Sequence, residues 1–254
     1  MGIQSLTFKL STDYSDNILK NKISKQLRIK DFNYQIENKS LDARNKSNIH
    51  WQVKVLVNSP EIKGEELLSK EELVIPYKKI GSKVVVTGSG PAGFFSAFVL
   101  QKAGFNVTLI ERGSEVGKRA KAILAFERNG IFNCQNNYAF GEGGAGTFSD
   151  GKLTARSKHI SKEKRFILSS YVEAGAPEEI LYMAHPHLGS DNLRRIIKNL
   201  RHSFEKQGGT FLFDTMLEDV IVANSKVKEV VTSRGILQAD ALFIAPGHSA
   251  FETY

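Results

Sequence analysis

Residues 83–111 read KVVVTGSGPAGFFSAFVLQKAGFNVTLIE, and this stretch decides the fold of the larger part of the chain. The apolar run Val84–Val86 predicts a buried strand that leads into a glycine turn. Residues 94–104 (FFSAFVLQKAG) predict a helix, and residues 106–113 (NVTLIERG) predict a second strand. Apolar strands joined by a helix are typical of a parallel sheet that is covered on both faces. The stretch therefore predicts an α/β fold with a Rossmann-like domain.

The turn fits the G-x-G-x-x-G pattern of dinucleotide-binding proteins, which needs a strand before it and a helix after it. Its residues are Gly88, Ser89, Gly90, Pro91, Ala92 and Gly93. Gly88 permits the tight turn, Gly90 lets the backbone approach a pyrophosphate, and Gly93 lets the helix pack closely on the strand. Pro91 fits the first helical turn, where its missing N–H costs nothing. The pyrophosphate is expected at the positive end of the helix dipole.

Glu111 ends the second strand, with seventeen residues between it and Gly93, and an acid at this place accepts hydrogen bonds from the adenosine ribose hydroxyls. An acid at this position disfavours a 2′-phosphate, so the pattern favours FAD or NAD over NADP. The alternative is a glycine turn that only reverses the chain between strand and helix.

A second glycine-rich stretch favours FAD over NAD. Residues 140–152 (FGEGGAGTFSDGK) hold five glycines in thirteen residues and can present backbone N–H groups to a planar heterocycle or an anion. The apolar strand Ala241–Ala245 ends in the residues PGHS, where Gly247 lets the backbone touch a cofactor. A flexible surface loop is the alternative for residues 140–152.

Four strings of residues carry a resemblance to a known family. They are ERG at 111–113, FGEGGAGTFSDGKLTAR at 140–156, PHLGSDNLRRIIKNLR at 186–201 and APGHSAFETY at 245–254. Together they resemble the bacterial family of uncharacterised FAD-dependent dehydrogenases (NAD(P)/FAD-dependent oxidoreductases) of the glutathione-reductase superfold, over essentially the whole chain. The GEGGAGTFSDGK string is the most specific of these motifs.

The resemblance implies an FAD-binding domain with the pyrophosphate at Gly88–Gly93 and the ribose at Glu111. It also implies which further residues lie near the cofactor: Arg112, Arg119, Ser149, Asp150, Gly151, Lys152 and Gly247. Among these, the segment from Ser149 to Lys152 is expected to approach the flavin.

Members of the family continue well beyond the GHSA motif, whereas this sequence ends at Tyr254. We therefore expect a fragment, truncated at its C-terminus, in which FAD binding and catalysis are weakened. The leading interpretation is an FAD-dependent oxidoreductase that is reduced by a nicotinamide cofactor, NAD(P)H, and acts on an unidentified small molecule. Two alternatives remain: a flavin-dependent RNA-modifying protein with a basic N-terminal part, and an inactive nucleotide-binding fragment.

The first eighty residues form a different kind of sequence. A strand is expected at Ser5–Leu10, a helix at Ser15–Leu27, a strand at Asn33–Glu37 or slightly later, and a strand at Ile49–Val57. We therefore expect a small β-α-β-β domain over residues 1–80 and the FAD-binding domain, which ends in several short strands (a β-meander), over residues 81–254. A later helix at Asn192–Gln207 is expected to be capped by Ser190 or Asp191.

Composition excludes several classes of protein. The 254 residues are 41% hydrophobic and 24% charged, and they contain no apolar run long enough to cross a bilayer. The single cysteine, Cys134, and the absence of a signal-peptide pattern favour a cytoplasmic location. The formal charge of +8 permits phosphate-rich partners, but no RNA-binding signature accompanies it, so nucleic acid is not an expected partner.

Four further side chains are candidates for chemistry by their residue type, three histidines and one lysine, together with the single cysteine. His185 and His187 lack the spacing and companion ligands of a metal site, so no metal is expected. His248 is a candidate for a proton donor or flavin contact, although a structural role is favoured, and no catalytic residue is assigned. Cys134 has no C-x-x-C partner, which disfavours a disulfide-reductase mechanism. Lys152 can stabilise negative charge on a reduced flavin if it points at the ring.

Overall fold

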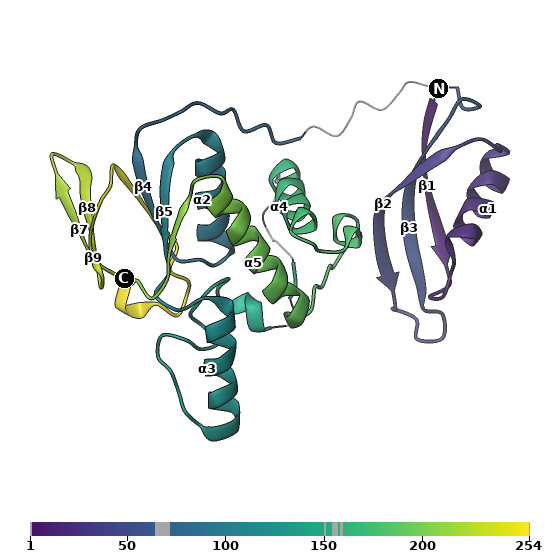
Figure 1. Cartoon of the computed structure of the whole chain (residues 1–254). Helices are drawn as coiled ribbons and strands as arrows, with labels where there is room; N and C mark the ends of the chain where they lie inside the picture. The colour runs from purple at the N-terminus through teal and green to yellow at the C-terminus, as the bar shows by residue number, and fades with distance from the viewer. Residues whose placement is uncertain (1, 64–71, 150, 154–156, 158–159, 254) are drawn as a thin grey trace. The chain divides into compact units, whose positions relative to one another are not determined.

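The structure is a computed structural model that describes residues 2–63, 72–149, 151–153, 157 and 160–253 (Figure 1). It divides into two compact units. Unit 1 comprises Met1–Glu72, Thr154–Arg165 and Pro177–Pro186, and unit 2 comprises Leu73–Leu153, Phe166–Ala176 and His187–Tyr254. The division into domains at residue 80 stays a prediction, which limited proteolysis can test.

Unit 1 contains the expected β-α-β-β order. Its elements are β1 (Gly2–Leu10), α1 (Asp16–Leu27), β2 (Asn33–Asp42) and β3 (His50–Ser59). The three strands form an antiparallel sheet in the order β1-β3-β2. Alternate residues of β1 and β3, such as Phe8 and Val55, are buried together with Leu19 and Ile23 of α1. The period-two pattern of the strands therefore builds this core.

Strand β2 is longer than the expected Asn33–Glu37. A register shift between Ile36 and Asn38 carries the strand past a bulge, and residues up to Asp42 pair with β3. Pairing with a neighbouring strand therefore overrides the polar composition of this stretch. The backbone N–H of Lys39 also donates to the carbonyl of Tyr182 (2.8 Å), and the N–H of Ala184 donates to the carbonyl of Lys39 (3.0 Å).

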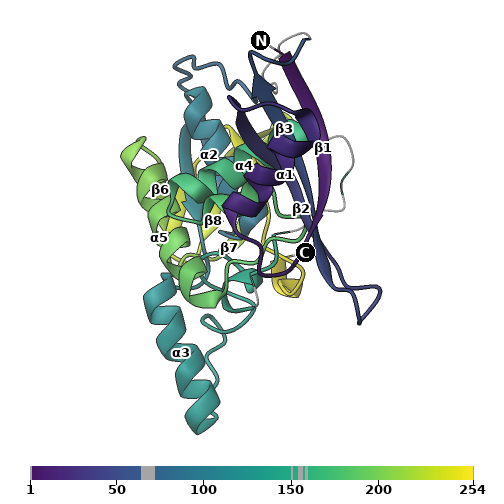
Figure 2. The same cartoon turned by 90° about the vertical axis from the view of Figure 1, so that its right-hand side faces the viewer.

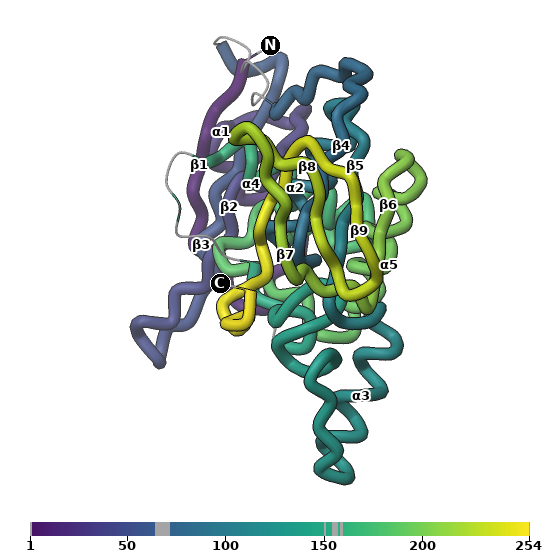
Figure 3. The backbone as a smooth tube through the Cα atoms, turned by 90° about the vertical axis from the view of Figure 1, so that its left-hand side faces the viewer, coloured from purple at the N-terminus to yellow at the C-terminus, as the bar shows by residue number. Residues whose placement is uncertain are grey.

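Unit 2 is built on a four-stranded parallel sheet in the order β10-β4-β5-β6. The strands are β4 (Lys83–Thr87), β5 (Asn106–Ile110), β6 (Thr210–Leu212) and β10 (Ala241–Ile244). An antiparallel meander of β7 (Leu217–Ala223), β8 (Lys226–Thr232) and β9 (Gly235–Gln238) lies over one face of this sheet (Figure 3). Helices α2 (Pro91–Ala103) and α5 (Ser190–Lys206) cover the other face (Figure 1).

Apolar residues fill both faces of the parallel sheet, as its uninterrupted valine run predicts. On the meander side, Val85 and Ile110 pack with Val230 of β8. On the helix side, the ring of Phe94 in α2 lies 6.3 Å from that of Phe204 in α5, and Phe204 is fully buried. The predicted α/β architecture with a meander is confirmed.

The remaining helices are α3 (Val116–Asn129), α4 (Ser161–Glu173) and three short 3₁₀ turns at Ala145–Phe148, Glu178–Leu181 and Phe251–Thr253. Helix α3 projects from unit 2 beyond its other helices (Figures 1 and 2). No helix in the described ranges is both long and apolar enough to cross a membrane.

The expected cap of α5 is wrong. The helix already begins at Ser190, so the capping position falls on Gly189, which has a φ of 70° and makes no side-chain capping bond. Asp191 lies inside the first turn and pairs with Arg194 instead. Glycine adopts a positive φ more easily than any other residue. Gly189 can therefore turn the chain into the start of the helix.

Candidate nucleotide-binding site

A cavity of about 360 Å³ lies at the carboxyl ends of the parallel strands. This is the edge at which open α/β sheets bind ligands. The cavity is lined from segments 87–92, 111–112, 139–141, 144–146, 215–217 and 245–249, together with Thr253. The glycine turn, the end of β5, part of the glycine-rich stretch and the end of β10 therefore meet at one place.

Close packing requires glycine at two positions of the turn, Gly88 and Gly93. Gly88 has a φ of 94°, and a Cβ there would overlap the carbonyl of Ala245. A Cβ on Gly93 would overlap the carbonyl oxygen of Gly88. At Gly90 the nearest atom to an added Cβ is the Cα of Gly144, 3.8 Å away, and this residue lines the cavity. The backbone at Gly90 is thus open to a ligand.

The N-terminus of α2 faces this cavity. Gly90 is its capping residue, Pro91 follows in the first turn, and no side-chain capping bond forms there within the described structure. The first N–H groups of a helix have no partner inside the helix, and the helix dipole places positive potential on them. The turn therefore has the form of an anion-binding site.

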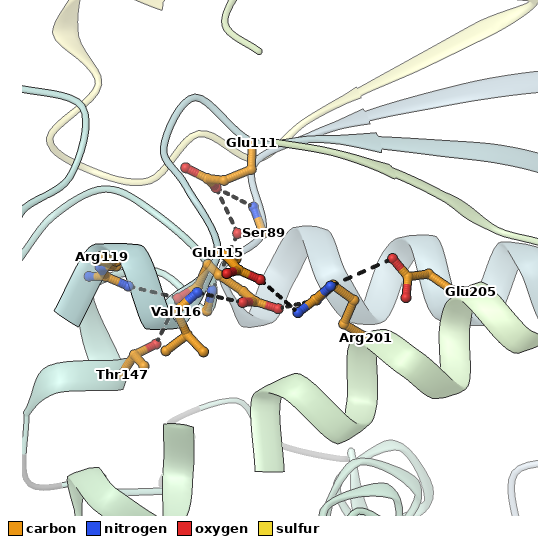
Figure 4. Close-up of polar contacts among 10 residues, drawn as sticks. Ser89, Glu111, Glu115, Val116, Arg119, Thr147, Arg201 and Glu205 are labelled. Carbon is orange, nitrogen blue, oxygen red and sulfur yellow. Dashed lines mark hydrogen bonds and ion pairs between the residues drawn. The ribbon is translucent and has the colours of Figure 1, made fainter. Parts of the chain in front are cut away.

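Glu111 stands next to the turn with four hydrogen-bond donors on its carboxylate. Oε2 accepts the backbone N–H (2.9 Å) and the hydroxyl (2.7 Å) of Ser89, and Oε1 accepts the N–H groups of Gly113 and Gly141 (both 3.0 Å). The side chain is 5% exposed, and Figure 4 shows it pointing at Ser89. Glu111 thereby joins the glycine turn to the glycine-rich stretch.

Arg119 binds the backbone of the glycine-rich stretch and of the residues just before it. Its guanidinium is fully buried and donates to five backbone carbonyls, and burial lowers its pKa to about 10, so it stays charged at neutral pH. The acceptors are Asn137 (3.0 Å), Tyr138 (3.1 Å), Gly141 (3.2 Å), Glu142 (2.8 Å) and Gly144 (2.8 Å). Residues 137–144, which include the start of the glycine-rich stretch, therefore surround the guanidinium of Arg119.

Glu142 fixes the same segment to two helices. Its carboxylate accepts the N–H of Val116 at the start of α3 (2.7 Å) and the Nε–H of Arg201 from α5 (2.7 Å). Burial raises the pKa of Glu142, whereas Val116 and Arg201 act against that rise. Arg201 also lies 3.5 Å from Glu115 and 3.8 Å from Glu205 (Figure 4).

Two further predicted residues, Arg112 and Gly247, line the cavity. The guanidinium of Arg112 lies 4.0 Å from the ring centre of Phe140 and pairs with Glu252 at 2.9 Å. Gly247 has a φ of 86° and no described atom within 4 Å of an added Cβ, so it leaves the cavity open. His248 lies beside it in the lining.

Two known domain families match parts of this chain. Residues 86–143 match the NAD(P)-binding Rossmann-like domain. Residues 2–58 match a domain of unknown function, DUF8436. The match to the Rossmann-like domain starts in β4 and includes the glycine turn and Glu111. Unit 2 therefore carries a Rossmann-like fold, as its sheet order also shows.

Individual relatives are similar over different lengths. An uncharacterised protein of Clostridium beijerinckii is 35% identical over 269 residues, covering 100% of this chain and 50% of the relative. The chain thus spans about half the length of that relative. The small chain of glutamate synthase [NADPH] of Bacillus subtilis is 51% identical over 43 residues, which are 17% of this chain and 9% of that protein.

Two solved structures that match part of this chain do so at low sequence identity. A THI4 protein of Thermovibrio ammonificans matches with a TM-score of 0.42 and 17% identity, over 67% of this chain and 59% of that one. An FAD-dependent pyridine nucleotide-disulphide oxidoreductase of Desulfovibrio vulgaris matches with a TM-score of 0.34 and 17% identity, over 65% of this chain and 24% of that one.

Several predicted site residues lie outside the cavity lining of the Rossmann-like domain. Ser149 is exposed and donates to the carbonyl of Gly146 (3.0 Å), and Asp150 lies outside the described residues. Gly151 and Lys152 run beside residues 187–188, where the N–H of Leu188 donates to Gly151 (3.2 Å). The approach of this segment to a flavin stays a prediction.

Sequence reasoning missed Arg201 and Glu142, and it placed Arg119 near the cofactor without seeing what it binds. The sequence indicates little about the contacts of Arg119, because its acceptors are main-chain carbonyls, which every type of residue has. The PHLGSDNLRRIIKNLR string does contain Arg201, but only the fold shows its partner. Across the described residues, no cluster of His, Cys, Asp and Glu side chains has the form of a metal site.

Thr87, directly before Gly88, lines the cavity with a buried hydroxyl that has no hydrogen-bond partner in the described part of the chain. We expect Thr87→Val to raise the free energy of unfolding of the ligand-free protein by about 1 kcal/mol, because it removes an unsatisfied buried group at nearly constant shape. Thermal or urea unfolding measures the change.

Thr232→Val is the matched control, because the hydroxyl of Thr232 is also buried but donates to the carbonyl of Gly235 (2.7 Å). That variant should lose about 1 kcal/mol. Equal losses in the two variants would contradict the assignment of Thr87 as an unsatisfied group.

Proposed function

We propose that this chain is the FAD-binding part of an oxidoreductase, with the FAD pyrophosphate at Gly88–Gly93 and the adenosine ribose beside Glu111. One observation carries the proposal. A single cavity combines the uncapped N-terminus of α2, which suits an anion, with a buried carboxylate that suits ribose hydroxyls.

The extent of the cavity lining supports a nucleotide cofactor such as FAD. Its lining continues from the turn along Gly144 and Gly146 to the end of β10, where Gly247 leaves space. Binding sites of about 300–1,000 Å³ are typical of small-molecule and cofactor ligands. Glu111 disfavours a 2′-phosphate, so an NADP molecule fits this cavity less well than FAD.

The bound flavin would supply the redox chemistry by accepting a hydride, and we propose a nicotinamide cofactor as its donor. This chain's residues would bind and orient the cofactor. Arg112 places its guanidinium, which pairs with Glu252, in the cavity lining. The relative of Clostridium beijerinckii is about twice as long as this chain, so we assign neither a substrate nor a final electron acceptor to the residues described here.

The test is reconstitution of the purified chain with FAD. We expect FAD to co-elute on gel filtration and give a visible flavin absorbance band. Glu111→Gln should weaken FAD binding, because a neutral amide oxygen is a weaker acceptor for the ribose hydroxyls than a carboxylate. Absence of FAD binding at micromolar protein would overturn the proposal.

A second measurement separates the enzyme from the inactive nucleotide-binding fragment. Oxidation of NADH or NADPH by the FAD-loaded protein, with a dye as acceptor, supports an oxidoreductase. Retention of FAD without NAD(P)H oxidation would support the fragment interpretation.

A further inference from the structure

Donors of this chain fill the acceptor positions of the Glu111 carboxylate. A carboxylate offers about four lone-pair positions, two on each oxygen. Here Oε1 accepts two N–H groups, from Gly113 and Gly141, and Oε2 accepts the N–H and the hydroxyl of Ser89. A ribose hydroxyl that binds Glu111 must therefore replace one of these four donors.

Only one of the four donors can leave without moving the backbone. Three are main-chain N–H groups, which the turn at Gly88–Gly90, the bend after β5 and the glycine-rich stretch hold in place. The fourth is the hydroxyl of Ser89, whose hydrogen can rotate about the Cβ–Oγ bond. Its oxygen also accepts the N–H of Gly143 (3.3 Å), and this bond does not require the hydroxyl to point at Glu111.

We propose that Ser89 is an affinity- and specificity-determining residue that occupies the ribose position of Glu111 until a nucleotide displaces its hydroxyl. The proposal rests on the proposed function, because it takes Glu111 as the ribose-binding residue. When the ligand arrives, the Ser89 hydroxyl gives up the charge-assisted bond to Glu111 at 2.7 Å and keeps only its oxygen on Gly143. The exchange costs the protein a hydrogen bond, so the wild type binds a ribose diol less tightly than its geometry allows.

The surroundings of Glu111 place the two hydroxyl groups in direct competition for one acceptor position. Ser89 and Glu111 are only 3% and 5% exposed and both line the cavity, so a ligand hydroxyl that reaches Glu111 lies beside the hydroxyl of Ser89. The competition therefore takes place between two hydroxyl groups, that of Ser89 and that of the ribose. A ligand without ribose hydroxyls does not enter this competition and leaves Ser89 on Glu111.

The experiment is a cycle that combines Ser89→Ala with removal of the ribose diol. The dissociation constants of ADP and of 2′,3′-dideoxy-ADP are measured by calorimetry for the wild-type chain and for the variant, with FAD as the reference ligand. Ser89→Ala should bind ADP roughly 3- to 10-fold more tightly, about the worth of one hydrogen bond, and should bind dideoxy-ADP unchanged. The thermal midpoint of the ligand-free variant should fall, because two hydrogen bonds are lost.

Ser114→Ala is the matched control. The hydroxyl of Ser114 is buried and bonds a carboxylate too, Asp214 Oδ1 at 2.6 Å, but neither residue lines the cavity. That variant should lose stability and leave both affinities unchanged. Ser89→Cys is a second test variant that preserves the shape, since a thiol is a weaker donor and should shift ADP binding in the same direction.

The outcomes separate the two proposals. If the wild-type chain binds neither FAD nor ADP, the proposed function falls and the role of Ser89 falls with it. If the wild type binds both, but Ser89→Ala weakens ADP binding or shifts ADP and dideoxy-ADP by the same factor, the role of Ser89 is overturned and the proposed function stands.

Discussion

Replacing Arg119 by methionine is expected to lower the free energy of unfolding by about 3–5 kcal/mol and to abolish nucleotide binding, because removal of a buried, fully bonded charge leaves its partners unpaired. Five carbonyls between Asn137 and Gly144 lose their donor. Methionine fills much of the space but donates no hydrogen bond, so the effect isolates the polar contacts. Urea unfolding and FAD titration measure the two losses.

Arg128→Met is the control for this prediction. Arg128 lies on the same helix, α3, but is exposed, so its replacement should change stability by less than about 0.5 kcal/mol. If Arg119→Met unfolded at the same urea concentration as the control, the central role given to this guanidinium would be wrong.

Gly93→Ala is expected to destabilise the Rossmann-like domain by more than about 3 kcal/mol and to remove nucleotide binding, since overpacking against backbone cannot be relieved by rotating a side chain. The added Cβ would overlap the carbonyl oxygen of Gly88 in the turn. Helix α2 would have to move away from β4, and the turn that faces the cavity would move with it. Circular dichroism during heating and FAD titration follow the two effects.

Gly117→Ala is a control that should change the free energy of unfolding in the opposite direction. Gly117 lies inside α3, and the nearest atom to an added Cβ is Glu115 Oε1 at 3.8 Å. Alanine is favoured over glycine in a helix, so this variant should gain about 0.5–1 kcal/mol. A stability loss at Gly93 no larger than the gain at Gly117 would show that α2 can shift at little cost.

Local patterns predicted the elements of unit 2 well, because short-range rules determine them. The valine run, the glycine turn and Glu111 lie in adjacent strand, turn and strand, and periodicity within each element is enough to place them. The structure brings the turn, Glu111, Arg112 and Gly247 to one cavity. Their contacts with FAD stay predictions.

Contacts between segments that lie far apart in the sequence could not be predicted from local patterns. The partners of Arg119 are main-chain carbonyls, which every residue possesses, so no residue type marks them. Strand β2 passes Glu37 because β3 offers it a partner, although Asn38 and Lys39 are poor strand formers. The additional bonds of Ser89 and Gly141 to Glu111 likewise depend on where loops meet.

The backbone bonds of Lys39 to Tyr182 and Ala184 have a consequence for biosynthesis. The N-terminal sheet leaves the ribosome early, whereas its last partners follow only after the chain has been made as far as residue 184. Until then the middle of β2 is an open edge, with an unpaired N–H and C=O that can pair with another nascent chain. Slow translation between the two segments would therefore prolong exposure to aggregation, and fast translation would shorten it.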